Sequence, residues 1–107
     1  EWDTAIWINI ATLPNTPHAN QFYREIEQWA LANYTGSYAT MRVEWSKGWA
    51  YTDQAGWADS TMLQTTIPNM LRDGQATNSN WDTEHTLLDK YDPFRIFTSP
   101  LQDKLGI

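Results

Sequence analysis

The chain of 107 residues contains no cysteine, so it offers no thiol for a disulfide bridge or a thiolate metal site. Its two histidines, His18 and His85, lie far apart without the spacing of metal ligands, and we expect no metal site. Basic residues are also scarce, with 7 Lys and Arg against 13 Asp and Glu. This balance argues against a nucleic-acid partner, because binding along a phosphate backbone requires clustered positive charge.

Long apolar runs are absent as well. No stretch approaches the ~20 apolar residues that cross a bilayer, so we expect no membrane span. The sequence has no phosphate-cradling glycine loop and no Ser-His-Asp order. A strand-like run starts within the first five residues, and we therefore expect a piece of a larger protein.

Aromatic residues, in contrast, are abundant. Seven Trp and a 14% aromatic content occur in a chain whose mean hydropathy is −0.61. Each aromatic side chain can bury roughly 150–250 Å², more in total than a small domain readily hides. We expect some rings to cover another segment, a cofactor or a ligand. The chain is then either a subdomain of a larger protein or a binding module that presents aromatic rings.

The first half of the chain predicts a strand, a helix and a second strand. Apolar residues alternate with polar ones in residues 5–13 and again in residues 38–52, which is typical of β-strands. Between them, residues 15–36 predict a helix that Asn15 or Thr16 caps, with an apolar stripe and a stop at a glycine. The predicted stripe consists of Phe22, Ile26, Trp29 and Ala30.

The second half predicts helices. Residues 57–71 fit a long helix that Pro68 kinks or restarts, and a short helix begins near Asn80 and ends before Asp92. The tail, residues 94–107, predicts an extended segment. The expected fold is α+β in the order β-α-β-α-α-tail, with residues 1–52 contributing two strands to a larger sheet and residues 53–107 forming a helical part. Two strands alone do not make a stable sheet.

The stretch from Met41 to Tyr51 sets three charges among aromatic rings. On a straight strand, Arg42 and Glu44 share one face, whereas Lys47 lies on the other unless Gly48 marks a bulge. A partly desolvated Arg–carboxylate pair can fix an anion or polarise a hydroxyl. The same residues also fit an ordinary salt bridge on a solvated strand face, worth about 0–1 kcal/mol.

Other polar residues carry weaker signals. Asn9 lies between β-branched neighbours in the first predicted strand, where Asn is disfavoured, so it is a candidate for binding a substrate hydroxyl. A satisfied, solvent-facing amide explains the same position equally well. Paired carboxylates such as Glu25 with Glu27 are typical of solvated helix faces and specify no glycosidase dyad.

At "RVEWSKGW" the chain resembles a known family. In vanillyl-alcohol-oxidase-like flavoproteins, lactone and polyol oxidases carry an R-x-H-W-x-K pattern, followed near the C-terminus by D-P-x-x-x-F. The matching residues here are Arg42, Glu44 in place of His, Trp45, Lys47, Asp92, Pro93 and Phe97. The Glu variant, with "YDPFRIF" and Trp-rich helices, is most similar to the flavin-linked bacterial cholesterol oxidases of this family.

The resemblance implies a C-terminal part of an FAD-dependent oxidase, with FAD bound mainly by residues outside this segment. The implied reaction oxidises a sterol secondary alcohol to a ketone and reduces O₂ to H₂O₂. It implies catalytic roles for Arg42, Glu44 and Lys47, and cofactor contacts for Lys47 and Asn9. It further implies that the substrate contacts are Asn9, Trp45, Trp49 and Tyr51. The implied partners are the rest of the flavoenzyme, an apolar alcohol and O₂, and relatives are often secreted or periplasmic.

Three alternatives stay open at this point. A noncatalytic carbohydrate-binding module would use exposed Trp platforms, although such modules are usually all-β and residues 21–34 strongly favour a helix. Another alcohol or lactone oxidase of the same flavoprotein family would share the motif. An accessory subunit or structural cap would use the aromatic rings as the core of an interface.

Overall fold

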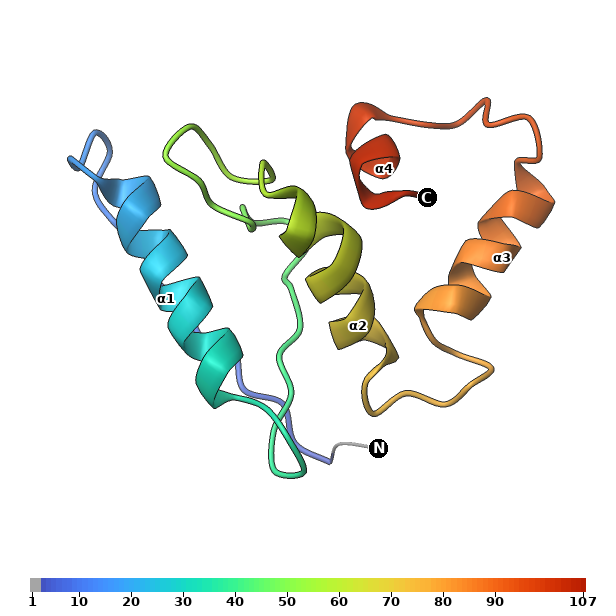
Figure 1. Cartoon of the computed structure of the whole chain (residues 1–107), viewed down its shortest axis with the longest axis horizontal. Coiled ribbons are helices and arrows are strands. Elements are labelled where there is room, and N and C mark those ends of the chain that lie inside the picture. The colour runs from blue at the N-terminus through green and yellow to red at the C-terminus, as the bar shows by residue number, and fades with distance from the viewer. Residues whose placement is uncertain (1–2) are drawn as a thin grey trace. The chain divides into compact units, whose positions relative to one another are not determined.

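The computed structural model describes residues 3–107. These residues divide into one unit that ends at Asp59 and a second unit from Ser60 to Ile107, and each is described by itself (Figure 1). The described residues contain the helices α1 to α4 and one π-helical turn, and no β-strand. The prediction of an α+β fold built on a sheet is therefore wrong for this part of the chain.

The first unit is built on α1, Ala19–Asn33, which confirms the predicted helix. Its N-cap is His18 in a left-handed conformation (φ 58°) without a side-chain cap, so the predicted Asn15 or Thr16 cap is wrong. The predicted stripe is right for Ile26 and Ala30 and wrong for Phe22 and Trp29, which are 44% and 56% exposed. The less exposed face instead carries Tyr23, Ile26, Glu27, Ala30 and Leu31.

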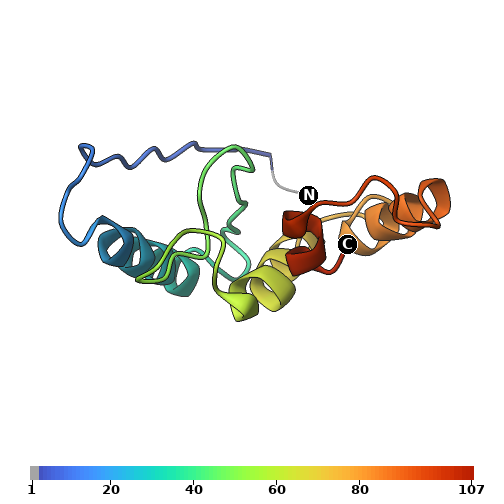
Figure 2. The same ribbon diagram turned by 90° about the horizontal axis from the view of Figure 1, so that it is seen from above.

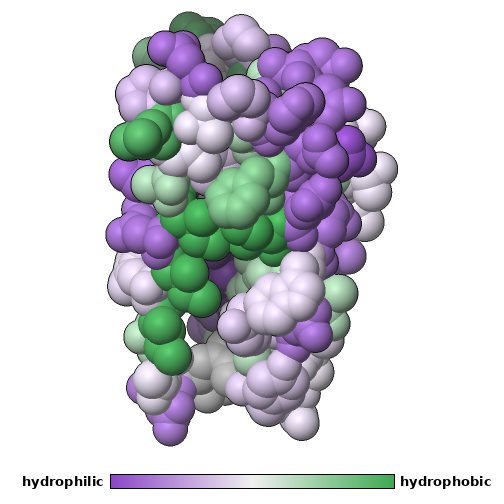
Figure 3. All heavy atoms as spheres, turned by 90° about the vertical axis from the view of Figure 1, so that its left-hand side faces the viewer, coloured by the Kyte–Doolittle hydropathy of each residue, from purple (hydrophilic) through white to green (hydrophobic). Residues whose placement is uncertain are grey.

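Residues 5–13 form neither helix nor strand (Figure 2). Ile6, Trp7 and Ile8 are 82%, 77% and 64% exposed, so side chains of both parities face outward. Figure 3 shows apolar side chains gathered on the face that carries this segment and α1. The backbone N–H and Oγ1 of Thr12 lie 2.8 and 2.9 Å from the Tyr23 hydroxyl, which ties the end of the segment to α1.

The second predicted strand, residues 38–52, is mostly irregular, with a turn at residues 45–46 and isolated bends. A period-two pattern fixes which side chains alternate, but a strand also needs a neighbouring backbone for its hydrogen bonds. The described residues supply no such ladder for either segment. The prediction that Arg42 and Glu44 share one face assumed a strand, and these residues form none.

The second unit begins with a helical run that changes its pitch at a proline. The π-helical turn η1, Met62–Thr66, leads directly into α2, Ile67–Arg72, which carries Pro68 in its first turn. The Ile67 N–H bonds to Met62 O, five residues back. Proline cannot donate a backbone hydrogen bond and clashes with the carbonyl four residues earlier, so a wider turn before it relieves the conflict. The predicted break at Pro68 thus takes the form of a π-turn.

Helix α3, Trp81–Tyr91, confirms the predicted short helix and its end before Asp92. Asn80 caps it, because its side-chain oxygen accepts bonds from the N–H groups of Asp82 and Thr83 at 3.1 and 3.2 Å. The Arg72 guanidinium at the end of α2 forms a two-pronged ion pair with Asp82, with Nη2 2.7 Å from Oδ1. This exposed pair joins α2 to α3.

The tail is partly helical, so the prediction of a wholly extended tail is wrong. Helix α4, Pro100–Leu105, begins at the Ser99 side-chain cap and ends at Gly106 in the left-handed region (φ 76°). Before it, the Asp92 carboxylate accepts bonds from the N–H groups of Ile96 and Phe97 at 2.8 and 2.7 Å. The aspartate of the "DPFRIF" motif therefore fixes a loop. Buried apolar residues of this unit are Met62, Leu63, Ile67, Met70 and Leu105.

Replacement of the α3 cap tests the fold of the second unit. Asn80→Ala leaves two N–H groups of the first turn without their acceptor, and should lower the free energy of unfolding by about 1 kcal/mol. Asn80→Ser should retain most of the wild-type free energy of unfolding, because a serine oxygen caps equally well. Chemical denaturation measures both, with Asn78→Ala in the preceding exposed loop as control. An equal effect of Asn78→Ala and Asn80→Ala would contradict the cap.

Candidate functional site

The motif residues Glu44 to Lys47 form a tight turn. The Lys47 N–H donates to Glu44 O at 2.9 Å, the bond that closes a β-turn. Within the turn, the Ser46 N–H donates to the Glu44 carboxylate at 2.8 Å. This bond, the Ser46 hydroxyl and the Lys47 charge together hold the pKa of Glu44 below its usual value. The turn thus presents an ionised carboxylate and an exposed ammonium three residues apart.

Aromatic rings brace this turn against the loop that follows it. The Trp45 and Trp57 rings are nearly parallel, with centroids 6.0 Å apart and planes at 7°. Backbone bonds from Trp57 N–H to Trp49 O, and from Ala58 N–H to Ala50 O at 3.3 Å, close the loop between them. We call residues 49–58 the bracing loop.

A carboxylate on α1 holds the start of the bracing loop. Glu27, only 6% exposed, accepts the Ala50 N–H at 2.8 Å through Oε1 and the Tyr51 N–H at 3.3 Å through Oε2. Ala50 is fully buried and left-handed (φ 55°), a strained conformation for a residue with a Cβ. The prediction of a solvated Glu27 is therefore wrong.

Burial shifts the pKa of Glu27 upward. Loss of solvation raises the pKa of its carboxyl, whereas the bonds from Ala50 and Tyr51 lower it. The nearby Asp59 raises the pKa further and Arg24 lowers it, and the net direction is upward from 4.5. Sequence reasoning missed this residue because its partners lie 23 and 24 positions away.

Tyr51 is fixed from two sides. Its ring packs against Tyr23 of α1 with centroids 5.0 Å apart, and burial raises the pKa of its phenol. Gly48 lies so close that an added Cβ would stand 2.5 Å from the Tyr51 Oη. A side chain at position 48 would displace the ring, so glycine is required for this close approach.

The structure places the predicted site residues in two groups. Glu44, Trp45 and Lys47 share the turn, and Trp49 and Tyr51 begin the bracing loop. Arg42 lies two residues before Glu44, half-buried, with its guanidinium Nη1 shielded from solvent. Asn9 lies apart from them in sequence, exposed on the N-terminal segment. The functional roles of these residues stay predictions.

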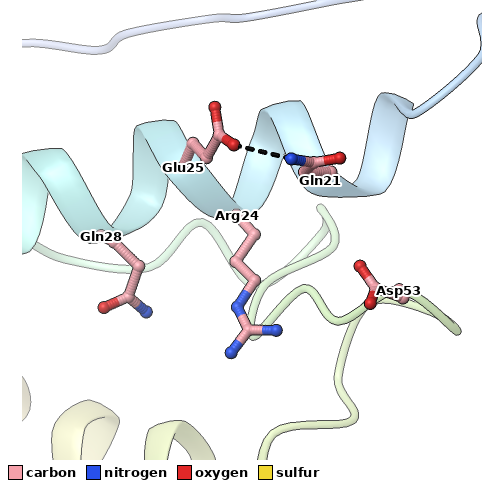
Figure 4. Close-up of a pocket in the computed structure, with 5 residues that line it drawn as sticks. All are labelled: Gln21, Arg24, Glu25, Gln28 and Asp53. Carbon is pink, nitrogen blue, oxygen red and sulfur yellow. Dashed lines mark hydrogen bonds between the residues drawn. The ribbon is translucent and has the colours of Figure 1, made fainter.

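A hollow of about 530 Å³ lies beside the bracing loop (Figure 4). Its lining is polar and consists of Gln21, Arg24, Glu25, Gln28 and Asp53. Figure 4 shows the Arg24 guanidinium extending from α1 toward the loop, while Gln21 Nε2 donates to Glu25 Oε1 at 2.9 Å. This lining has no apolar side chain and does not match an apolar alcohol.

The donor chemistry of the turn fits a flavin, whose ring carries carbonyl oxygens and gains negative charge on reduction. Lys47 in the turn and Asn9 on the N-terminal segment are exposed hydrogen-bond donors, and their contact with a flavin stays a prediction. No cluster of three metal-ligand side chains occurs within residues 3–107. In the same range, no helix has the length and apolar character to cross a membrane.

The pH dependence of stability tests the buried state of Glu27. Because the folded-state pKa is raised above 4.5, the Glu27 contribution favours folding below that pH and is lost as pH rises through the folded pKa. The free energy of unfolding of the wild type minus that of Glu27→Gln should therefore fall as the pH rises above 4.5. Urea denaturation across this range measures it, and a difference that is flat or rises with pH contradicts the burial.

The packing at Gly48 gives a second prediction. Gly48→Ala should lower the free energy of unfolding by about 1–2 kcal/mol, because the new methyl group must displace the packed Tyr51 ring. The near-UV circular dichroism of tyrosine should change with it. Gln54→Ala, an exposed substitution in the same loop, is the control and should change neither quantity. If Gly48→Ala changes neither the free energy of unfolding nor the near-UV circular dichroism, the close approach of Gly48 to the Tyr51 ring is contradicted.

Comparison with known proteins identifies relatives for this arrangement. A family model described as "Cholesterol oxidase, substrate-binding" matches residues 1–106. A solvent-stable cholesterol oxidase is similar in structure with a TM-score of 0.82 and 67% identity, covering 90% of this chain and 18% of that one. Cholesterol oxidase from B. sterolicum is similar with a TM-score of 0.77 and 39% identity, covering 86% and 17%. No curated protein matches the chain.

The chain therefore spans less than a fifth of the length of the solved structures to which it is similar. The match nevertheless extends over nearly all of its own residues. It confirms the resemblance carried by the "RVEWSKGW" and "YDPFRIF" motifs. The chain belongs to the family of cholesterol oxidase substrate-binding domains.

Proposed function

We propose that this chain forms part of the substrate site of an FAD-dependent oxidase that converts a sterol secondary alcohol to a ketone. The observation that carries the proposal is the family match over residues 1–106, joined to 67% identity with a cholesterol oxidase. In this reaction the alcohol loses a hydride from its carbinol carbon and a proton from its hydroxyl group. FAD, when bound, accepts the hydride, and O₂ then takes up two electrons and two protons to give H₂O₂.

Lys47 and Arg42 supply fixed positive charge in this reaction. A preorganised cation beside a bound flavin would stabilise, without reorganisation, the negative charge that the ring gains on reduction. The Lys47 ammonium is exposed on the turn, and its backbone is fixed by the bond to Glu44 O. Arg42 is half-buried, where reduced solvation strengthens its field. Asn9 donates its amide to the cofactor or the substrate hydroxyl.

Glu44 orients the substrate hydroxyl as an ionised acceptor. Its lowered pKa keeps the carboxylate charged at neutral pH, because the Ser46 N–H satisfies one oxygen. The lowered pKa also makes it a weak proton acceptor. We therefore propose that Glu44 positions the substrate hydroxyl by accepting its hydrogen bond, and that its negative charge balances Lys47 and Arg42.

The rings contribute apolar surface. Trp45 is 45% exposed while it stacks on Trp57, so one part of the ring is braced and another is open to a ligand. Trp49 and Tyr51 extend this surface along the bracing loop. A sterol skeleton is apolar and rigid, and it binds well against fixed aromatic faces.

The remainder of the flavoenzyme is the proposed partner. Large apolar side chains are exposed in both units, among them Trp7, Tyr91, Phe94 and Phe97 at 77–84%. Exposed apolar surface of this kind is typical of an interface. The proposed partner covers these side chains and contributes most of the FAD site.

Substitutions in the turn of the full-length enzyme test the proposal. Glu44→Gln, Arg42→Ala and Lys47→Met should each lower kcat for sterol oxidation by about 10²-fold, because each removes a charge that acts on the reacting groups. Flavin content, measured by absorbance, should remain near normal. H₂O₂ release and ketone formation measure turnover.

Two controls accompany these variants. Lys47→Arg keeps the positive charge and should retain much of the activity. Glu84→Gln removes an exposed carboxylate in the first turn of α3 and should leave kcat unchanged. Normal turnover in all three turn variants would remove this motif from the catalytic site.

A further inference from the structure

The bracing loop is anchored by one buried carboxylate. Glu27 is the buried charged side chain of the described residues, and both of its oxygens are engaged by backbone N–H groups. Burying a carboxylate is unfavourable unless hydrogen bonds replace its water. The Ala50 and Tyr51 N–H groups are that replacement, and the carboxylate accepts one of them on each of its two oxygens.

The anchored backbone is conformationally demanding. Ala50 is held at φ 55° with no exposed surface, and Trp57, whose N–H bonds to the neighbouring Trp49 O, is held at φ 59°. Neither residue is a glycine, and such conformations persist when the surroundings over-determine them. The Glu27 bond to the Ala50 N–H is a direct constraint on the first of these two residues.

A short path connects this anchor to the motif turn. Ala50 follows Lys47 by three residues, and between them Gly48 packs against the Tyr51 ring. Trp49 O accepts the Trp57 N–H, and the Trp57 ring stacks on Trp45 inside the turn. Backbone hydrogen bonds and ring contacts therefore link Glu27 to the Glu44–Lys47 turn.

We propose that Glu27 is the positioning residue of the Glu44–Lys47 turn, acting through the Ala50 and Tyr51 amides. The importance of that turn for turnover rests on the proposed function above. Glu27 itself contacts neither substrate nor cofactor in this role. A displacement of the reacting groups by about 1 Å can cost 10²-fold in rate, so a released anchor affects kcat from a distance.

Glu27→Gln in the full-length, flavin-loaded enzyme tests the proposal. The amide keeps the size of the side chain but replaces one of the two bonded oxygens with an NH₂ donor, so the backbone N–H that faces this donor loses its acceptor in either orientation. Hydrogen exchange, measured by mass spectrometry on the peptide spanning residues 44–51, should be about 10-fold faster at Ala50 and Tyr51. In the same variant, kcat should fall about 10-fold while KM stays within about twofold.

Glu25→Gln is the matched control. Glu25 lies two residues earlier on α1, is exposed, and bonds to Gln21. This variant should leave exchange in residues 44–51 and kcat unchanged. If Glu27→Gln does not fold, Glu27→Asp replaces it in the same measurements. It keeps the charge, but its shorter side chain no longer reaches the Ala50 and Tyr51 N–H groups.

The two proposals fail in different ways. Unchanged exchange in residues 44–51 overturns the anchoring by Glu27, whatever the turn does. A lower melting temperature with normal exchange and normal kcat reduces Glu27 to a structural residue and also overturns it. Faster exchange with normal kcat removes the positioning role, and if Lys47→Met is also fully active, the proposed function of the turn falls as well.

Discussion

The first unit depends on a carboxylate that has exchanged water for two backbone N–H groups. Glu27 lies on the face of α1 that carries Tyr23, and the residues it holds, Ala50 and Tyr51, return to that face from beyond the motif turn. Without strands in this part of the chain, no ladder fixes residues 38–58. A side chain performs the task that a neighbouring strand performs elsewhere. The bonds are few, so each one constrains more of the backbone.

The second unit is organised by local signals, and for this reason much of it could be predicted. A start near Asn80 and an end before Asp92 predicted α3, and Pro68 predicted the interruption that the structure shows as a π-turn. Ser99 followed by Pro100 is an equally clear start signal for α4, with Gly106 as its end, yet the alternating pattern of the tail concealed it. Caps and prolines act within four residues, so the sequence displays them directly.

The first unit was harder to predict, because its constraints act over longer distances. Period-two alternation in residues 5–13 and 38–52 indicated strands, but alternation does not show whether a pairing backbone exists. The Glu27 charge indicated a solvated helix face, since nothing near it in the sequence reveals the Ala50 and Tyr51 amides. The motif itself was informative, because its residue types and spacing identified the family that the comparison then confirmed.

The turn also changes how the motif's charges are grouped. On a straight strand, Glu44 and Lys47 would point to opposite faces, and Glu44 would pair with Arg42. In the observed turn, the backbone bond between Glu44 and Lys47 brings these two residues together, and the Lys47 charge contributes to the low pKa of Glu44. A fixed carboxylate beside an exposed ammonium can hold a hydroxyl proton and a developing anion at adjacent points. The proposed roles of Glu44 and Lys47 therefore rest on a turn rather than on a strand face.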